Sequence, residues 1–480
     1  MLEEAFDLFV KAAPATVIIR GVLENILSAK RLDAIFADAA EIQYTRDLAF
    51  SSVVRLMSKV VMRIRPSVNA AYREQAEELD VTHKCVYDKL NGIEPQVSRE
   101  LVRRTAREME LVIRTMKAEL PDLLPGYRVR ILDGNHLAGT DRRLKVLRGQ
   151  SGAALPGQAL AVLDPALRLM TDIFPCEDAY TQERALLPQV LKIVEAGDLW
   201  IDDRNFCTIE FLCGIAGKNA AFLTREHACL PWEPVGEQVY VGGVETGRVF
   251  EQAVQLVDAQ GKEFLVRRIT IELKKPTRDG EMVLHLLTNV PVEHADALAI
   301  ARLYCERWQV ETAFLELTVD LCCEIHTLGY PKAALFAFAV AVLCFNAFSV
   351  AKAALRSVKP SDSDAATPIK TSSNETPPTR QPTKRPPPAD NLSTYYLADE
   401  VASTWRGMMV VLPDQFWKDK FADLTATELA GELEKLANCA DITRYQKRAR
   451  STKCTTRATP CHPGSHVSTA RELKKQLLQT

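Results

Sequence analysis

Several features that would mark a secreted, membrane or generally basic protein are missing from this sequence. The first ten residues, MLEEAFDLFV, are acidic and do not have the pattern of a signal peptide. The 12 cysteines are scattered and contain no CxxC pair, which favours reduced thiols over a disulfide framework. A continuous apolar run at residues 333–345 is shorter than the roughly 20 residues that cross a membrane, so it predicts a buried helix and no membrane partner. The formal net charge is −2, so any binding to nucleic acid has to come from local clusters of Lys and Arg.

The composition changes along the 480 residues and predicts several regions. Residues 1–120 have helical periodicity and predict a helical N-terminal domain, whereas residues 125–355 combine strand and helix patterns. Residues 357–393 are dominated by Ser, Thr and Pro, which favours a disordered linker. Residues 395–480 predict helices followed by a basic tail, with nine Lys or Arg against one acid from residue 444 onwards. This tail is either a phosphate-contacting or a solubilising segment, and it contains a candidate zinc set without CxxC spacing: Cys454, Cys461, His462 and His466.

Residues 70–90 have the layout of a helix-turn-helix. Two helical segments flank Asp80-Val81-Thr82, and Thr82 is a good cap for the second segment. A DNA-binding motif of this kind contacts bases from the start of its second helix, here Thr82, His83, Lys84 and Tyr87. A plain helical hairpin explains the same pattern. Residues 98–120 predict a further helix, whose arginines recur at spacings that give a basic face: Arg99, Arg103, Arg104 and Arg107.

Strand patterns begin at residue 127 and predict an RNase H-like fold. Residues 127–132, 159–163 and 167–174 read as three consecutive antiparallel strands, followed by a helix at 181–195. The first strand ends on Asp133 and is expected to turn at Gly134, so that the strand fixes the carboxylate. The next strand, within residues 199–206, contains Asp202 and Asp203. Because neighbouring side chains of a strand point to opposite faces, only one of these two shares a cleft with Asp133.

Residues of about 230–290 are rich in strand patterns and predict a β-rich insertion beside the sheet that the preceding strands form. Strand-like runs alternate there with turns that contain Gly and charged residues. The segment also carries five basic residues, Arg267, Arg268, Lys274, Lys275 and Arg278. These either face DNA or protect a solvated sheet edge.

Residues 301–319 contain no Gly or Pro and have apolar residues at helical spacing. Tyr304, Arg307 and Glu311 lie at positions i, i+3 and i+7, so a helix places them on one face. An arginine suits phosphate, and a glutamate suits a hard divalent cation. An ordinary surface ion pair between Arg307 and Glu311 is the alternative.

The Tyr304-x2-Arg307-x3-Glu311 pattern resembles the Y-(2)-R-(3)-E signature of DDE transposases of the insertion sequence 4 family. The segments Arg307-Trp308-Gln309-Val310-Glu311 and Leu287-Thr288-Asn289 are also similar to that family. The family pattern continues with a lysine seven residues after the glutamate, and Thr318 stands at that position. The Asp-Arg-x-Phe pattern of the family selects Asp203 rather than Asp202.

The resemblance implies cut-and-paste transposition with Asp133, Asp203 and Glu311 as catalytic residues and metal ligands. Three carboxylates from two strand ends and a helix suit two Mg²⁺ ions, with Mn²⁺ as a substitute, that clamp a phosphoryl displacement. The implied partners are double-stranded DNA, as terminal inverted repeats and target, and a second copy of the chain in a homodimer on DNA. The implied location is the cytoplasm of a prokaryotic cell, at the nucleoid when bound. The expected DNA contacts are Tyr304, Arg307, Trp308, Arg142, Arg143, Lys145 and Arg148.

Some of these roles have competing explanations. Trp308 either stacks on a displaced base or lies in the core, and the basic residues at 142–148 either bind phosphates or form a solvated turn. The whole chain is alternatively a catalytically inactive DNA-binding derivative of a transposase, which the missing lysine at Thr318 leaves open. Another RNase H-like nuclease is the third alternative, and the spacing around Tyr304 disfavours it.

Overall fold

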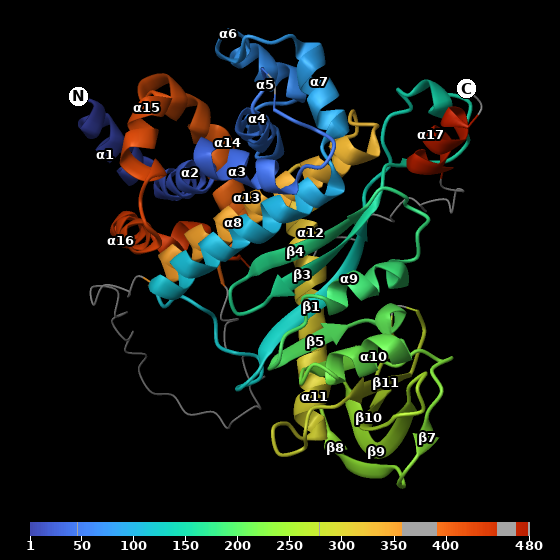
Figure 1. Cartoon of the computed structure of the whole chain (residues 1–480). Helices are drawn as coiled ribbons and strands as arrows, with labels where there is room; N and C mark the ends of the chain where they lie inside the picture. The colour runs from blue at the N-terminus through green and yellow to red at the C-terminus, as the bar shows by residue number, and fades with distance from the viewer. Residues whose placement is uncertain (46, 278, 358–390, 449–466, 479–480) are drawn as a thin grey trace, which may run out of the picture.

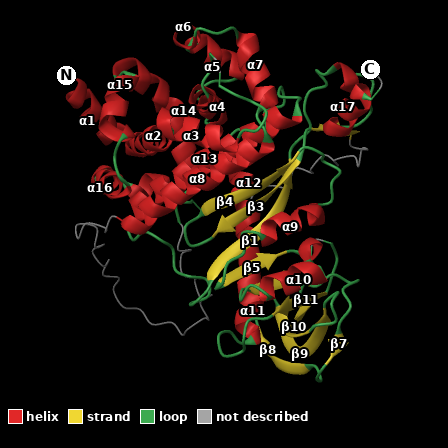
Figure 2. Ribbon diagram, in the orientation of Figure 1, coloured by secondary structure: helices red, strands yellow, loops and turns green. Residues whose placement is uncertain are grey.

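The protein is built from a large mixed β-sheet with helices on both faces (Figures 1 and 2). The computed structural model describes all residues except 46, 278, 358–390, 449–466 and 479–480. One hydrophobic core joins the sheet face of Ile131 and Ile201 to the N-terminal, central and C-terminal helices. A second core lies on the opposite face, where Leu132 and Trp200 pack under α9 (Leu187–Leu191) and α10 (Ile209–Ala216). The chain therefore has an α/β architecture with two differently covered sheet faces.

The sheet starts with the three antiparallel strands that the sequence predicts. They are β1 (Arg128–His136), β3 (Gln158–Asp164) and β4 (Leu169–Cys176). On its other edge β1 pairs in parallel with β5 (Asp198–Asp202), which pairs in parallel with β6 (Ala221–Arg225). The helix predicted at 181–195 is shorter and consists of η2 (Glu183–Leu186) and α9. The strand order β4-β3-β1-β5-β6 brings the carboxyl ends of β1 and β5 to one edge of the sheet.

The β-rich segment continues this same sheet instead of packing beside it. Its strands are β7 (Glu233–Pro234), β8 (Val239–Gly243), β9 (Gly247–Val257), β10 (Glu263–Leu273) and β11 (Val283–Thr288). Strand β11 pairs with β6, so the segment adds strands to the sheet edge (Figure 1). The reason is that β6 would otherwise leave its backbone groups unpaired, and β11 satisfies them.

Two basic residues of the β-rich segment bind within the protein instead of forming a free surface. Arg267 donates to Glu251 and to two backbone carbonyls, and Arg268 pairs with Glu226 at 2.6 Å. Lys274 donates to the carbonyl oxygens of residues 244 and 245, Lys275 is exposed, and Arg278 lies outside the described residues. Arg267 and Arg268 are therefore held by acceptors within the protein, and contact of the five basic residues with DNA stays a prediction.

The N-terminal helices cover one face of the sheet. They are α1 (Leu2–Ala12), α2 (Pro14–Ile26), α3 (Ala29–Ala39), α4 (Phe50–Val61), α5 (Val68–Glu74), α6 (Ala76–Leu79), α7 (His83–Gly92) and α8 (Pro95–Thr115). The turn of the expected helix-turn-helix has a left-handed Asp80, with φ of 47°, followed by a Thr82 side chain that caps α7 by accepting from the backbone N–H of Cys85. His83 and Lys84 are exposed, and their contact with DNA stays a prediction.

The basic face expected on α8 is largely neutralised. Arg99 forms two 2.9 Å hydrogen bonds with the buried carboxylate of Asp172 on β4, and Arg103 also lies 3.4 Å from that carboxylate. Arg104 pairs with Asp38 at 2.7 Å, and Arg107 is exposed. Helix α8 therefore uses Arg99 and Arg103 to dock on the sheet and Arg104 to contact α3.

Helix α13 (Pro331–Ser357) is the centre of the helical layer. Its 27 residues include the apolar run at 333–345, and it packs against α8, α2, α4 and β4. It is the one helix in the described part of the chain that is long and apolar enough to cross a membrane, and its most apolar stretch is entirely buried inside the protein. Its burial agrees with the expected core helix.

The C-terminal part returns to both regions of the molecule. Helices α14 (Thr394–Val411), α15 (Asp414–Trp417) and α16 (Ala426–Ala437) join the N-terminal helices, where Arg20 pairs with Asp414 at 2.6 Å. The short strand β12 (Val467–Ser468) pairs in parallel with β2 (Ala154–Leu155), and α17 (Thr469–Leu477) follows. The expected linker at 357–393 and the four Cys and His residues of the tail fall almost entirely outside the described residues.

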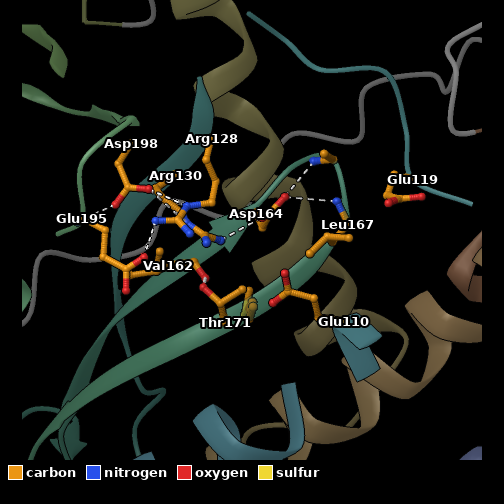
Figure 3. A network of polar contacts seen from close by, with 12 residues as sticks. Glu110, Glu119, Arg128, Arg130, Val162, Asp164, Leu167, Thr171, Glu195 and Asp198 are labelled. Atoms are coloured by element: carbon orange, nitrogen blue, oxygen red, sulfur yellow. Dashed lines mark hydrogen bonds and ion pairs between the residues drawn. The ribbon is translucent and has the colours of Figure 1, made fainter. Parts of the chain in front are cut away.

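A network of ion pairs fixes the amino-terminal end of β1 (Figure 3). Arg128 donates to Asp198 and Glu195 at 2.6 Å each, and Arg130 donates to Asp164 at 2.8 Å. Asp164 and Asp198 are almost fully buried, so these charge-assisted bonds compensate for their lost hydration. Strand β1 is thereby anchored to β3 and β5 at the end opposite to Asp133.

Candidate active site

Strands β1 and β5 deliver Asp133 and Asp203 to the same face of the sheet. Asp133 has the same orientation along β1 as buried Ile131, and Asp203 follows the last residue of β5. Strand β1 does not turn at Gly134 as expected but continues to His136. The glycine has another role, because a Cβ there would lie 1.8 Å from a carboxylate oxygen of Glu183.

Asp202 points to the opposite face and is buried. Its carboxylate accepts a hydrogen bond from the Thr224 hydroxyl on β6, and it has no exposed surface. Burial raises the pKa of Asp202 well above its ordinary value, and the Thr224 hydrogen bond only partly offsets this effect. The structure thus places Asp203, and not Asp202, on the side of Asp133.

Glu311 comes from a helix that passes under this face. The predicted helix at 301–319 begins earlier and is interrupted, as α11 (Ala297–Tyr304), a 3-10 turn (Cys305–Arg307) and α12 (Trp308–Val319). The side chain of Asp296 caps its start by accepting from the backbone N–H of Ala299. The element packs against β1 through α12, which brings Glu311 near Asp133.

Arg307 joins two of the three candidate carboxylates. One guanidinium nitrogen, Nη1, donates to Asp133 Oδ2 at 3.0 Å, and Nη2 donates to Glu311 Oε1 at 2.7 Å. Arg307 is nearly buried, whereas the Glu311 side chain is 46% exposed. The hydroxyl of buried Tyr304 lies 3.5 Å from Asp203 Oδ1. Tyr304 and Arg307 together therefore contact all three candidate carboxylates, which lie in one cluster.

The charges of this cluster act on Asp133. Burial raises the pKa of Asp133 to about 6, the Arg307 guanidinium opposes that rise, and the negative charges of Glu311 and Asp203 add to it. Burial also raises the pKa of Tyr304, which keeps its phenol protonated as a hydrogen-bond donor. Asp133 is thus close enough to the other two carboxylates to be influenced by their charges.

The donor set fits a hard divalent cation by its chemistry, since carboxylate oxygens are the ligands that Mg²⁺ prefers. In the part of the chain that the structure describes, no three Asp, Glu, His or Cys side chains stand close enough to hold one ion as arranged. Asp133 and Glu311 instead share the cationic guanidinium of Arg307. Binding of one metal ion by all three carboxylates therefore requires a rearrangement of the cluster.

Trp308 lies on the surface beside this cluster. Its side chain is 62% exposed, so the alternative of a core tryptophan is wrong. The reason is that the 3-10 turn ends at Arg307 and directs the first residue of α12 to solvent. Thr318, at the position of the expected lysine, is exposed on the same helix. An aromatic ring is therefore available next to Glu311.

The basic residues at 142–148 lie in a turn that packs against the C-terminal helix. Arg142, Arg143, Lys145 and Arg148 are all exposed. Helix α17 packs against this turn (Figure 1). Ser468 and Arg471 both donate to Asp178 at 2.7 Å. Lys474 and Lys475 of α17 are exposed as well. The turn and α17 together form a basic surface that combines residues more than 300 positions apart.

A cavity of about 810 Å³ lies beyond the ends of β1 and β5. Its lining includes His136 from β1, Asn205 from the turn after β5, and Glu183. Asn205 donates to the Glu183 carboxylate, which also lies against Gly134. Sequence reasoning missed Glu183, and the only signal for it was the glycine that directly follows Asp133.

Part of the chain is similar to a known protein family. Residues 124–345 match the family model described as "Transposase DDE domain", a range that includes Asp133, Asp203 and Glu311. No curated protein matches the chain. Among solved structures, one match is the "Cryo-EM structure of piggyBac transposase synaptic complex with hairpin DNA", with 10% sequence identity, a TM-score of 0.37 and coverage of 88% of this chain and 85% of that chain. Residues 124–345, a little under half of the chain, are therefore similar to a transposase DDE domain.

Proposed function

We propose that this protein is a cut-and-paste DNA transposase of the insertion sequence 4 type, with an RNase H-like catalytic core. The observation that carries the proposal is the cluster of Asp133, Asp203 and Glu311, which Tyr304 and Arg307 contact inside the matched domain. The strand order β4-β3-β1-β5-β6 supports the RNase H-like core, because three antiparallel strands precede two that are parallel to β1.

Asp133, Asp203 and Glu311 would hold the divalent ions, two Mg²⁺ or Mn²⁺ in their place. Such ions activate a water molecule or a 3′-hydroxyl and stabilise the leaving oxygen in phosphodiester hydrolysis and strand transfer. Asp133 and Asp203 are fixed by the sheet, which holds their carboxylates in place before DNA binds. Glu311 is half exposed and is the most exposed of the three.

The remaining residues of the site bind and orient DNA. Arg307 can exchange its carboxylate partners for a phosphate of the element end, because its planar fork suits both anions. Tyr304 keeps its hydroxyl proton and orients Asp203 through the 3.5 Å contact. Trp308 offers an exposed ring for stacking on a base.

The basic surface of the 142–148 turn and α17 would bind the phosphate backbone of the same DNA. Its exposed lysines and arginines make up for the absence of a positive charge on the chain as a whole. Terminal inverted repeats and target DNA are the proposed partners, in a homodimer at the nucleoid of a prokaryotic cytoplasm.

A cleavage assay tests the proposal. The wild-type protein should cut an oligonucleotide of the element end in Mg²⁺ or Mn²⁺ and fail to cut it in EDTA. Asp133→Asn, Asp203→Asn and Glu311→Gln should each abolish cleavage but retain DNA binding. Asp202→Asn should retain cleavage, because the Asp202 carboxylate faces the other side of the sheet. Glu293→Gln, at an exposed carboxylate outside the cluster, is the control for changes in surface charge.

The second candidate function is that of an inactive DNA-binding derivative. The contacts of Arg307 with both Asp133 and Glu311 favour it, since they neutralise two of the three candidate ligands. This candidate predicts that wild-type protein binds the element end and never cleaves it, in any divalent ion. Cleavage by the Glu311→Gln variant at the wild-type rate would exclude the transposase mechanism.

A further inference from the structure

The apolar helix α13 carries a buried polar stripe that faces the sheet. Asn346, Ser349 and Lys352 are spaced three residues apart and are almost completely buried. The Asn346 amide both accepts from the backbone N–H of Met170 and donates to its carbonyl oxygen, each at 2.9 Å. The Ser349 hydroxyl donates to the carbonyl oxygen of Arg168 at 2.7 Å. Three polar residues in a core helix are costly unless their polar atoms find partners, and here Asn346 and Ser349 tie α13 to the start of β4.

Arg168 connects this stripe to the helix of Glu311. It lies in the turn between β3 and β4 with a φ of 58°, a left-handed conformation that a non-glycine residue adopts at a cost. Its side chain is 6% exposed, and Nη1 donates to the Gln309 side chain at 3.0 Å. Nη2 lies 4.0 Å from Glu316. One strained residue therefore reaches two side chains that lie about two turns apart on α12.

Glu316 is the meeting point of three separate elements. Its carboxylate lies 3.6 Å from the ammonium group of Lys352 on α13 and accepts from the Thr394 hydroxyl, at the start of α14, at 2.7 Å. Glu316 is five residues after Glu311 and is buried, whereas Glu311 is exposed. The inner face of α12 is thus held by charges, and the outer face carries the candidate active-site carboxylate.

We propose that Glu316, together with Arg168 and Lys352, is a set of positioning residues that fixes α12 against the sheet and so sets Glu311 relative to Asp133. The link to Asp133 runs through the sheet, because Arg168 belongs to the β3–β4 hairpin and β3 pairs with β1 directly opposite Asp133. The contacts between buried charges fix the orientation of α12 on the sheet, whereas an apolar interface would leave that orientation less defined. The expected effect of these residues on catalysis rests on the proposed function, whereas their effect on the position of α12 does not.

Glu316→Gln tests the proposal, with Glu24→Gln as the matched control. Glu24 is also a buried carboxylate with a cationic partner, Arg55 at 2.9 Å, but it joins α2 to α4 away from the site. Both variants should lose stability. Only Glu316→Gln should weaken Mn²⁺ binding and slow cleavage, by about tenfold or more, because displacements of about 1 Å are costly at a catalytic site. Binding of the element-end oligonucleotide should stay within about twofold of wild type, as an estimate for an unchanged DNA surface.

Hydrogen exchange of the α12 backbone amides separates this inference from the proposed function. The amides of residues 308–319 should exchange faster in Glu316→Gln and remain unchanged in Glu24→Gln. If wild-type protein neither binds Mn²⁺ nor cleaves DNA, the proposed function fails, while the exchange of α12 still tests the network. Wild-type exchange, Mn²⁺ affinity and cleavage in Glu316→Gln would overturn the inference.

Arg168→Lys is the second variant if Glu316→Gln fails to fold. It retains the buried positive charge but loses the fork that reaches both Gln309 and Glu316. The same weakening of Mn²⁺ binding and the same faster exchange of α12 are expected. Unchanged values for both measurements would show that the network only stabilises the fold.

Discussion

Arg307→Ala is expected to separate DNA binding from the geometry of the carboxylate cluster. The wild-type guanidinium contacts Asp133 at 3.0 Å and Glu311 at 2.7 Å in the free protein. If Arg307 exchanges these partners for a phosphate of the element end, the variant loses one phosphate contact. If Arg307 only joins the two carboxylates, the variant changes stability and leaves DNA binding as it was.

The size of both effects follows from the structure. The Glu311 contact stabilises the fold by at most about 1 kcal/mol, because the Glu311 side chain is about half exposed. The Asp133 contact is worth more, about 1–3 kcal/mol, because Asp133 is mostly buried. One lost phosphate contact makes the slope of log K against log salt concentration shallower by about 0.9, so wild type should lose about 3.5-fold more affinity than the variant over a fourfold rise in salt.

Titration of a labelled element-end oligonucleotide at several salt concentrations measures this slope. Arg302→Ala is the control, since Arg302 is an exposed arginine on the neighbouring α11. Glu311→Ala should bind DNA at least as well as wild type, because it releases one arm of the guanidinium. Equal slopes for wild type and Arg307→Ala would refute the phosphate contact, even if cleavage were lost.

Three further predictions concern separate parts of the molecule. Trp308→Ala should leave thermal stability unchanged, because the ring is 62% exposed, and should weaken DNA binding by about 1–3 kcal/mol in a gel-shift assay if the ring stacks on a base. Burial raises the pKa of Glu94, but hydrogen bonds donated by the backbone N–H groups of residues 41–43 outweigh this effect and hold the pKa below its ordinary value. Glu94 therefore stabilises the fold above about pH 4.5 and loses this effect as pH falls through its folded-state pKa, so Glu94→Gln should lower the melting temperature at pH 7 and differ less from wild type at pH 4. Phe336→Ala should cost about 3–5 kcal/mol of unfolding free energy in denaturant titrations, because the ring is fully buried in α13, whereas Leu315→Ala at a 52% exposed position should cost far less.

The sequence by itself determined most local elements. Alternating residues marked the first of the three antiparallel strands, strand-like runs joined at Asp164-Pro165-Ala166 marked the other two, and Thr82 marked the start of α7. These patterns work because side-chain alternation and helix capping depend on residues only a few positions apart. Asp133 and Glu311 became candidates in the same way, from a strand end and from one helix face.

Local patterns were less reliable where the partner of an element was unknown. The arginines of α8 have the spacing of a basic face, but Asp172, 73 positions after Arg99, holds two of them. The β-rich segment reads as a separate insertion, yet β11 completes the edge of β6. In each case the sequence showed one partner of a contact, an arginine or a strand, and could not show the distant partner.

Only the tertiary structure decided how the candidate site is assembled. It placed Asp203 beside Tyr304 and buried Asp202 against Thr224, a choice that strand alternation leaves open until the covering of each sheet face is known. It also brought Glu316 together with Lys352 and Thr394, whose positions in the sequence lie 36 and 78 residues beyond it. The physical reason is that both choices depend on burial and charge compensation between distant elements, and these arise only when the chain packs.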